Sequence, residues 1–377
     1  MNYPGGYILE LAWGCPSKRY PLNGIFQFDQ ASALKNEGES VVYAAIDMRS
    51  IKNWRKFGIN HRIWKDIDVY EFNMPFGPFL VPIRHLLEKI CFILLINRII
   101  RKFGKPKCVH VHNCDVCLCS MGYCLKHGIQ YIITEHSMPR AQSKRVEKSK
   151  RWAYKNAKKV IAVSANLAGR IHCIYNVQPI IIHNIVDFSQ FSFILNENRN
   201  DDDTFLFISA ARLVAGKRID LLLEAFARVV KKYNNCRLEI MGEGPERNNL
   251  QNQAEKLDIS EKVSFYGYYS KAEFAVELRK SACFVLPSRS ETFGIVYVEA
   301  LACGNPVIAT RCGGPEDFVD KTNGVLVELD DVAALESAMV YMLKNIKLYD
   351  REYIATECKN RFSPNIIARK IISIVNG

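Results

Sequence analysis

Hydrophobic and polar positions alternate in blocks along the whole chain. Short, nearly continuous apolar runs such as residues 205–210 (FLFISA) recur, and longer stretches with apolar positions at helical spacing, such as 219–233, lie between them. The short runs are typical of strands buried on both faces, and the longer stretches are typical of helices that cover a sheet. The alternation therefore predicts an α/β fold with parallel sheets covered on both faces.

The pattern divides into two series of elements. In the first we expect strands at 7–13, 40–46, 66–71, 108–112, 131–134, 160–162 and 179–182, and helices at 24–36, 79–102, 115–127, 144–156 and 165–175. In the second we expect strands at 204–210, 237–241, 263–266, 283–286, 306–309 and 324–326, and helices at 219–233, 245–257, 271–281, 294–303 and 332–345. The polar, turn-rich residues 196–204 (NENRNDDDT) between the series are typical of a linker.

The length of the chain supports the same division, because 377 residues suffice for two separate cores. We expect an N-terminal domain over residues 1–185 and a C-terminal domain over residues 186–360. Residues 361–377 restart a helix, with Ser363 as a favourable N-cap and Pro364 as a favourable first residue. We expect this last helix to cross back onto the N-terminal domain.

Charge is distributed unevenly between the two series. Residues 1–185 contain 27 Lys and Arg against 12 Asp and Glu, whereas residues 186–377 contain 24 against 27, in a chain with a net charge of +12. A basic first half indicates an anionic partner, namely phospholipid, a phosphorylated acceptor or nucleic acid, unless it is only a lysine-rich solvated surface.

Composition also bears on the location of the protein. Its 13 cysteines are scattered and odd in number, so reduced thiols are the better interpretation. The uncharged apolar run at 90–97 is far shorter than the ~20 residues of a spanning helix, and the first residues show no signal-peptide pattern. We expect a cytoplasmic protein, with peripheral association at the inner face of the cell membrane.

Candidate chemistry begins after the strand at 205–210. Arg212 and Lys217 follow that strand and precede a helix, and the carboxyl ends of strands are where open α/β sheets bind ligands. Two cations beside a helix N-terminus are suited to a diphosphate, although a solvated basic loop has the same composition. Gly242 and Gly244 come at the end of the next strand, where glycine permits a tight turn and close approach of a ligand.

Two glutamates flank the start of the helix at 294–303. Glu291 precedes it and Glu299 lies within it, and the helix N-terminus offers the N–H groups of Phe293, Gly294 and Ile295. Carboxylates accept paired hydrogen bonds from vicinal diols, which suits a ribose or a hexose; salt bridges to nearby cations are the alternative. Farther on, Gly313 and Gly314 precede Glu316 and a predicted helix start, and form another candidate anion or sugar cradle.

The order and spacing of these motifs resemble the retaining family-4 glycosyltransferases of the GT-B fold. The resemblance is strong over residues 205–329 and rests on four motifs: Arg212…Lys217, Gly242-x-Gly244, Glu291-x-Phe293-Gly294-x₄-Glu299-Ala300 and Gly313-Gly314-x-Glu316. It is looser in the first half, where it rests on Asn23-Gly24, HVH (110–112), TEHS (134–137), VIAVSANLAGRI (160–171) and HNIVDFSQF (183–191). Ile185 departs from the family pattern, which usually has glycine after Asn184.

The resemblance implies an α/β, GT-B fold in which two Rossmann-like domains face a central cleft, and it implies roles for single residues. Arg212 and Lys217 would hold the donor diphosphate, Glu299 the ribose, and Glu291 with the N–H groups of Phe293 and Gly294 the transferred sugar. His136 would contact the sugar or orient the acceptor. Gly24 would let the first loop approach the phosphate, and Gly242, Gly313, Gly314 and Glu316 would line the donor site.

The resemblance also implies an activity and its partners. The reaction would be hexosyl transfer with retention, from a UDP- or GDP-linked sugar to a glycan or lipid-linked acceptor, such as a polysaccharide precursor, with no metal, no other cofactor and no nucleic acid. A nucleotide-sugar epimerase on the same fold, or a catalytically inactive scaffold that binds membrane, are the alternatives.

Three further features have two interpretations each. Cys114-x-x-Cys117 with His110 and His112 has partial zinc spacing but lacks a second cysteine pair, so buried core cysteines are favoured. Asp201–Asp203 is favoured as solvated linker over a metal site. The apolar stretch 82–107, with its basic end, is either a core helix or an anionic-membrane contact, and the basic run 140–155 is a second candidate for a phosphorylated lipid acceptor.

Overall fold

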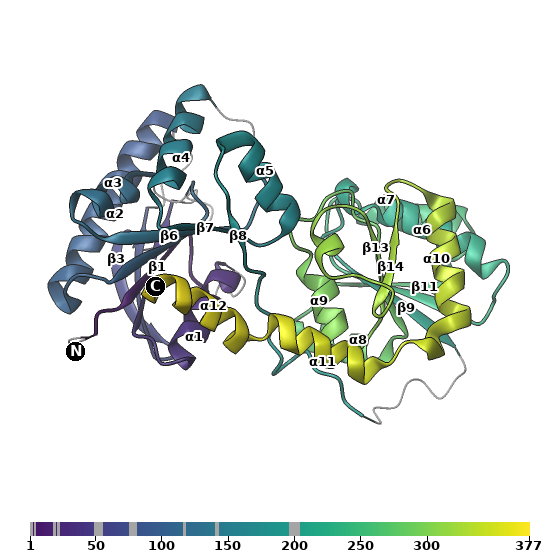
Figure 1. The fold of residues 1–377 in the computed structure, drawn as a ribbon. Coiled ribbons are helices and arrows are strands. Elements are labelled where there is room, and N and C mark those ends of the chain that lie inside the picture. Colours follow the sequence, from purple (N-terminus) through teal and green to yellow (C-terminus); the bar gives the residue numbers. More distant parts are fainter. Residues whose placement is uncertain are drawn as a thin grey trace. The chain divides into compact units, whose positions relative to one another are not determined.

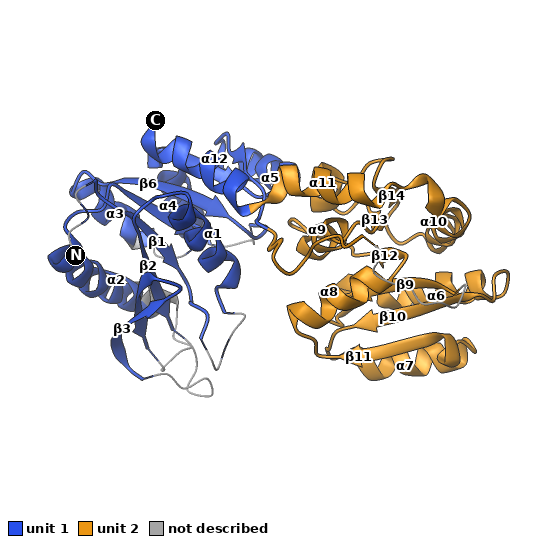
Figure 2. Ribbon diagram, turned by 90° about the horizontal axis from the view of Figure 1, so that it is seen from below, with its two compact units in different colours: residues 1–185, 364–377 blue, residues 186–363 orange. Residues whose placement is uncertain are grey.

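The computed structural model describes residues 3, 5–17, 20, 23–48, 56–74, 81–115, 118–139, 143–195 and 204–377, without the side chains at 81, 82, 84, 85 and 119. The chain forms two compact units (Figure 2). Unit 1 comprises Met1–Ile185 and Pro364–Gly377, and unit 2 comprises Val186–Ser363. The linker aspartates 201–203 and Cys117 lie outside the described residues.

Unit 1 is built on one sheet with strand order β3-β4-β2-β1-β5-β6-β7-β8 (Figure 1). The strands are β1 (Ile8–Ala12), β2 (Val41–Asp47), β3 (Gly58–Trp64), β4 (Ile67–Asn73), β5 (Cys108–His112), β6 (Gln130–Glu135), β7 (Lys159–Ala162) and β8 (Ile180–Ile181). The helices between them are α1 (Ile25–Asn36), α2 (Val81–Phe103), α3 (Leu118–Lys126), α4 (Lys144–Asn156) and α5 (Ala165–Tyr175). The order reverses between β1 and β5, so these neighbours form the topological switch point of unit 1.

One edge of this sheet is not parallel, contrary to the wholly parallel sheet expected from the alternation. Strand β3 is absent from the predicted elements, and it pairs antiparallel with β4 through a turn at Lys65 and Asp66, both with positive φ. A two-residue hairpin of this kind needs no covering helix, so the strand–helix alternation gives no sign of it. The polar positions along β3 fit an edge strand that is only partly buried.

The last helix of the chain belongs to unit 1. Helix α12 (Pro364–Asn376) contributes Ile367, Ala368 and Ile371 to the same apolar core as Phe28 and Leu34 of α1. This core covers one face of the sheet, and α12 carries the colour of unit 1 in Figure 2 although it follows unit 2 in sequence. Helix α12 begins at Pro364, directly after Ser363, whereas the segment predicted from the sequence begins at residue 361.

Unit 2 contains a wholly parallel sheet with strand order β11-β10-β9-β12-β13-β14. The strands are β9 (Phe205–Ala210), β10 (Cys236–Met241), β11 (Val263–Gly267), β12 (Cys283–Leu286), β13 (Val307–Thr310) and β14 (Gly324–Val327). The α-helices are α6 (Ile219–Val230), α7 (Arg247–Lys256), α8 (Lys271–Lys280), α9 (Ile295–Ala302), α10 (Val332–Asn345) and α11 (Arg351–Phe362). The switch point lies between β9 and β12.

Two local features of unit 2 differ from the sequence prediction. Helix α11 is absent from the predicted elements because its apolar positions are sparse: only Ile354, Cys358 and Phe362 are buried. The helix expected to start at Pro315 is a short 3₁₀ turn, Gly314–Asp317. Among the described residues, no helix has the length and apolar character needed to cross a membrane.

Candidate functional site

The switch point of unit 2 brings two of the predicted residues into contact. The loop after β9 carries Lys217 in a 3₁₀ turn, Ala215–Lys217, and the loop after β12 carries Glu291. The Lys217 Nζ atom lies 2.5 Å from Glu291 Oε1, and both side chains are partly exposed. The two loops are also joined by the backbone, since Arg289 N donates to Gly216 O at 2.9 Å. A cation and an acid predicted separately from the sequence thus form one pair at the expected edge of the sheet.

Glu291 is fixed from several directions. Ser288 Oγ donates to Glu291 Oε1 at 2.7 Å. The backbone of Glu291 pairs with the loop after β13: its N–H donates to Cys312 O at 3.1 Å, and Gly314 N donates to its carbonyl at 2.9 Å. The side chain is therefore held in one place, as a residue that positions a ligand requires.

The glycines of the predicted donor site are needed for close backbone packing. A Cβ on Gly314 would lie 2.2 Å from Phe293 O, and a Cβ on Gly242 would lie 1.8 Å from Ala211 O. Gly242, Gly294 and Gly313 also have positive φ angles of 141°, 88° and 115°. These contacts bring the loops after β9, β10, β12 and β13 together at the carboxyl edge of the sheet.

Helix α9 separates the two predicted acids. Gly294 is its N-cap, so the helix begins at Ile295, and Phe293 precedes the cap with its side chain buried. Glu299 lies inside the helix and is 7% exposed. Burial is the main cause that raises the pKa of Tyr269, and the charge of Glu299 is the second. The Glu299 carboxylate therefore lies near that ring. Glu299 is thus a buried acid of helix α9 whose charge acts on Tyr269.

Arg212 and Glu316 lie on the surface of unit 2. The Arg212 side chain is exposed and makes no side-chain hydrogen bond to another described residue, so its guanidinium is open to a ligand. Glu316 is exposed as well, and its Oε1 accepts from Gly313 N at 3.0 Å. Glu316 therefore stabilises the turn that shapes the loop after β13.

A second set of charges at this edge is missing from the sequence prediction. Asp330, which follows β14, accepts from Arg218 and lies 3.0 Å from Arg289 Nε. Arg218 also binds Asp220 at 3.0 Å. Through Arg218 and Arg289, the Asp330 carboxylate links the loop that carries Lys217 to the loop that carries Glu291. No spacing motif marks it, because its partners are about 40 and 110 residues away.

Unit 1 contains the remaining two predicted residues. Gly24, with φ 68°, is the N-cap of α1, and a Cβ there would lie 2.2 Å from Gly14 O. His136 follows β6 and is half-buried. Its Nε2 lies 3.0 Å from His112 Nδ1, and its Nδ1 lies 3.1 Å from Asn184 Oδ1. Both ring nitrogens of His136 are therefore already engaged within unit 1.

One group among the described residues has the composition of a metal site. Glu10, His110 and His112 place their ligand atoms within 4.8 Å of one another, and all three are buried. The zinc alternative considered for Cys114 and Cys117 involves two of these residues, but the Cys114 thiol is buried and its pKa is raised well above the ordinary value, first by burial. Such a thiol is a poor candidate for a thiolate ligand.

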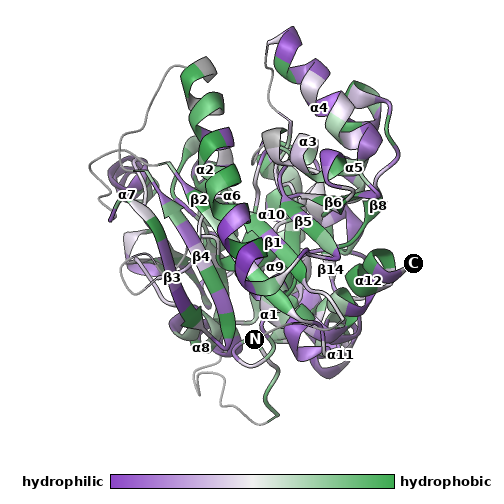
Figure 3. Ribbon diagram, turned by 90° about the vertical axis from the view of Figure 1, so that its left-hand side faces the viewer, coloured by the Kyte–Doolittle hydropathy of each residue, from purple (hydrophilic) through white to green (hydrophobic). Residues whose placement is uncertain are grey.

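The surface of α2 combines apolar and basic side chains. Ile83, Leu86, Ile90 and Leu94 are 46–59% exposed, and their spacing places them on one stripe of the helix. In Figure 3 most of α2 is coloured as hydrophobic, whereas α4 is mostly hydrophilic. Beside the stripe lies a hollow of about 650 Å³, whose lining includes Leu86, Lys89, Arg145, Lys148 and Trp152.

Comparisons with known proteins match both units. The Glycosyltransferase Family 4 model matches residues 41–190, and the Glycosyl transferases group 1 model matches residues 190–357. An uncharacterized glycosyltransferase of Methanocaldococcus jannaschii is 30% identical over 227 residues, which cover 59% of this chain and 61% of that protein.

A second relative is the GDP-mannose-dependent alpha-(1-6)-phosphatidylinositol monomannoside mannosyltransferase of Mycolicibacterium smegmatis. It is 34% identical over 145 residues, which cover 36% of this chain and 38% of that protein. The matched segments thus span less than two thirds of either relative.

The fold is shared with solved structures. The structure of Anabaena HepE in complex with UDP-glucose has a TM-score of 0.72 at 15% identity, and covers 98% of this chain and 99% of that one. Because the two family models follow one another across both units, the chain belongs to the glycosyltransferases of the GT-B fold, with a Family 4 part followed by a group 1 part.

Proposed function

We propose that this chain is a retaining hexosyltransferase that moves a sugar from a nucleotide-diphosphate sugar to a lipid-linked saccharide or a cell-surface polysaccharide precursor. The observation that carries the proposal is the Lys217–Glu291 pair at the switch point of unit 2. Ligands of open α/β sheets bind outside the carboxyl ends of the strands at such a point.

The charges at this edge suit the two halves of the donor. The open guanidinium of Arg212 and the ammonium of Lys217 bind the diphosphate and stabilise the charge that develops on it as it leaves. Glu291 binds hydroxyl groups of the transferred sugar, and Glu299 binds those of the ribose. We propose that these two cations make a metal unnecessary.

The way in which Glu291 is engaged bears on the mechanism that we propose for retention. Glu291 already accepts from Lys217 and Ser288, which lowers its reactivity as a covalent nucleophile. We therefore propose a same-face displacement, in which the leaving diphosphate takes the proton of the attacking acceptor hydroxyl.

The surface of α2 suggests the kind of acceptor. Its exposed apolar stripe beside Lys89, Arg145 and Lys148 is suited to an anionic lipid surface, because the apolar side chains enter the interface while the cations bind phosphate. The M. smegmatis relative is named for a phosphatidylinositol mannoside acceptor, and the HepE structure is named for bound UDP-glucose. We propose a peripheral enzyme with a UDP- or GDP-linked donor.

The test is product analysis with the purified chain. It is incubated with UDP-glucose or GDP-mannose, with and without vesicles that contain lipid-linked saccharides, and free nucleotide and the anomeric configuration of the product are measured. Acceptor-dependent nucleotide release with a retained anomer supports the proposal. An epimerised donor without an acceptor indicates the epimerase, an inverted anomer contradicts retention, and no turnover over a full panel of donors and acceptors indicates the inactive scaffold.

A further inference from the structure

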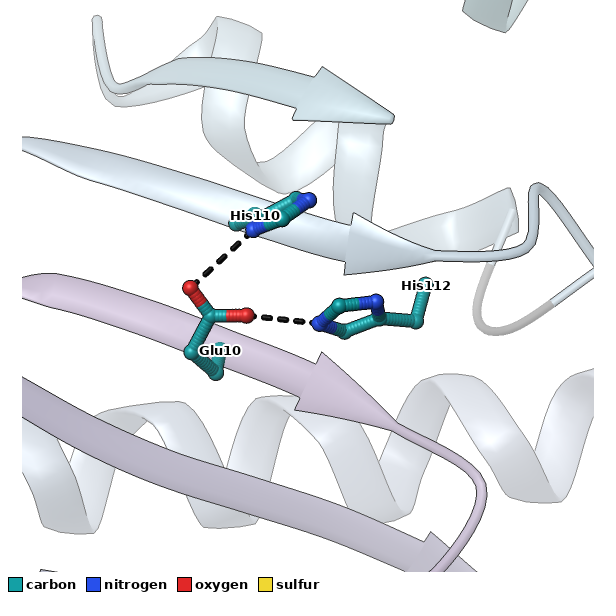
Figure 4. A group of neighbouring side chains, drawn as sticks. All are labelled: Glu10, His110 and His112. Atoms are coloured by element: carbon teal, nitrogen blue, oxygen red, sulfur yellow. Dashed lines mark hydrogen bonds and ion pairs between the residues drawn. The ribbon is translucent and has the colours of Figure 1, made fainter. Parts of the chain in front are cut away.

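A continuous chain of hydrogen bonds runs along the switch point of unit 1. The two oxygens of Glu10, on β1, face His110 Nδ1 at 3.0 Å and His112 Nε2 at 2.6 Å, both on β5 (Figure 4). His112 continues to His136, with 3.0 Å between Nδ1 and Nε2. At the other end, His110 Nε2 lies 2.7 Å from Thr134 Oγ1. The chain joins a buried carboxylate to the half-buried ring of His136.

The position of these side chains is unfavourable unless they have a role. Glu10, His110 and His112 are 0–1% exposed. Side chains alternate along a strand, so they lie on the same face as Ile8 and Cys108, which belong to the apolar core with α1 and α12. An acid and two imidazoles among apolar side chains cost free energy that an aliphatic trio would not. This unfavourable burial occurs at the β1–β5 strand pair, the switch point at which open α/β sheets bind ligands.

Burial and mutual contact set the charge of each group. Burial alone would raise the pKa of Glu10, but the charges and hydrogen bonds of His110 and His112 outweigh it and lower the pKa to about 2. Burial is the largest cause that lowers the pKa of His112 to about 4 and of His136 to about 3. At neutral pH the carboxylate is ionised and both of these rings are neutral. The titratable groups that act on His136 are His112, His110 and Glu10.

These charges determine the direction of the hydrogen bonds. An ionised carboxylate only accepts, so His112 carries its proton on Nε2 and presents a lone pair at Nδ1. His136 must therefore donate from Nε2, and as a neutral imidazole it keeps a lone pair at Nδ1. In the structure the Asn184 atom beside Nδ1 is Oδ1, at 3.1 Å, and two acceptors cannot share a hydrogen bond. A lone pair at Nδ1 therefore requires the amide to be turned over, with its NH₂ group toward the ring, because amide oxygen and nitrogen are assigned from such hydrogen-bond patterns.

The backbone holds the same ring in place. The His136 N–H donates to Asn113 Oδ1 at 2.8 Å, and Asn113 N donates to Thr134 O at 2.7 Å. Asn113 has a φ of 66°, an uncommon conformation that is frequent at functional sites. Side-chain and backbone contacts thus fix the position and the orientation of the imidazole together.

The geometry does not favour a metal among Glu10, His110 and His112. The carboxylate bridges the two rings, with one nitrogen opposite each oxygen, whereas a metal requires all ligands to converge on one point. The 2.6 Å separation of His112 Nε2 and Glu10 Oε2 is a direct hydrogen-bond distance. The trio therefore fits an acid that accepts from two N–H groups.

We propose that Glu10 and His112 are positioning residues that hold His136 in its Nε2–H tautomer, so that Nδ1 accepts a hydrogen bond from a hydroxyl of a bound sugar. In the free protein the Asn184 amide occupies that lone pair, and the hydroxyl replaces it on binding. The ligand class rests on the proposed glycosyl transfer, whereas the tautomer is a property of the free chain. A neutral nitrogen of fixed direction accepts a hydrogen bond from a hydroxyl group. Unlike a carboxylate, it carries no negative charge that would attract a cationic group such as a guanidinium.

The experiment is nitrogen NMR of the free, full-length chain labelled with ¹⁵N-histidine, recorded from pH 5 to 8. His136, assigned by its loss in His136→Gln, should show a protonated Nε2 and an unprotonated Nδ1, and should stay neutral over the whole range. In Glu10→Gln the acceptor-only group is gone, and His136 should become a mixture of both tautomers. Thr134→Val is the matched control, because it removes a hydrogen bond at the far end of the chain and should leave the His136 signals unchanged.

Each other outcome contradicts the proposal. A His136 that is protonated on Nδ1 or titrates near pH 6.5 in the wild-type protein overturns it, even if Glu10→Gln fails to fold. Unchanged His136 signals in a folded Glu10→Gln protein also overturn it, as does one equivalent of metal retained after dialysis, since that would assign the trio to metal binding. The spectra are recorded without substrate. A failure of the proposed transferase activity would therefore not affect the result for the His136 tautomer.

Discussion

The ammonium of Lys217 and the carboxylate of Glu291 meet at 2.5 Å, although 74 residues separate them. We expect Lys217→Ala to lower kcat by at least about 100-fold, because the developing charge on the leaving diphosphate loses a preorganised cation. The melting temperature should change little, since the pair is partly exposed. Steady-state kinetics with the donor found in the product assay, beside thermal unfolding, provide the measurement. Lys256→Ala on the exposed end of α7 is the control, and equal rates in the two variants would contradict the assignment.

Glu299 should contribute to nucleotide binding. Glu299→Gln removes the charge but keeps the shape, and we expect the Kd for the free nucleoside diphosphate to rise about 10-fold or more, as for loss of charge-assisted hydrogen bonds. Isothermal titration calorimetry checks this. The exposed Glu255→Gln should bind like the wild-type protein; if Glu299→Gln does too, the ribose role is wrong.

The crowding at Gly314 predicts a loss of stability. A methyl group there would lie 2.2 Å from Phe293 O, so Gly314→Ala must displace backbone, and we expect a loss of about 1–3 kcal/mol in the free energy of unfolding. Gly169→Ala, in α5 with no atom within 4 Å of its new Cβ, should instead be neutral or stabilise by up to about 1 kcal/mol. Denaturant unfolding of both variants makes the comparison.

The exposed stripe of α2 predicts lipid binding. The triple variant Leu86→Ser, Ile90→Ser and Leu94→Ser should bind vesicles containing phosphatidylglycerol at least about 10-fold more weakly, because each side chain buries less apolar area. Sedimentation with vesicles measures the partition. Leu348→Ser, an exposed leucine of unit 2, is the control. Equal binding of wild type and triple variant would refute the membrane contact.

The depressed pKa of His136 predicts an acid-dependent stability. Its folded pKa is about 3 and its unfolded pKa is about 6.5, so below pH 6.5 the unfolded state binds more protons and the free energy of unfolding falls as the pH falls. The slope is about 1.4 kcal/mol per pH unit for one such group.

His136→Gln should remove that part of the slope between pH 6.5 and pH 4. Glu135, whose pKa burial raises to about 7, acts in the opposite direction, and it cancels when variant and wild type are compared. Chemical denaturation over this range makes the measurement, with the exposed His172→Gln as control. Parallel profiles of His136→Gln and wild type would show that the ring is not held neutral.

The fold was predictable where local pattern and burial coincide. In unit 2 the strands β9, β12 and β13 are buried apolar runs between helices, so they follow from the sequence. Strand β3 and helix α11 were not predicted, because an edge strand and a sparsely buried helix carry weak periodicity. The start of unit 2 at Val186 and the return of α12 to unit 1 were expected from the sequence, although the contacts that produce them join residues far apart in the chain.

The sequence by itself determined the candidate residues of a donor site, because Lys217, Glu291, Glu299 and the glycines are marked by their type and by their spacing after strand ends. Only the tertiary structure decided which of them touch, and it alone revealed Glu10 and Asp330. A carboxylate inside an apolar strand has no local signature. Its partners are chosen by strand register across about 100 residues, and that register is set by the packing of whole sheets rather than by neighbouring residues.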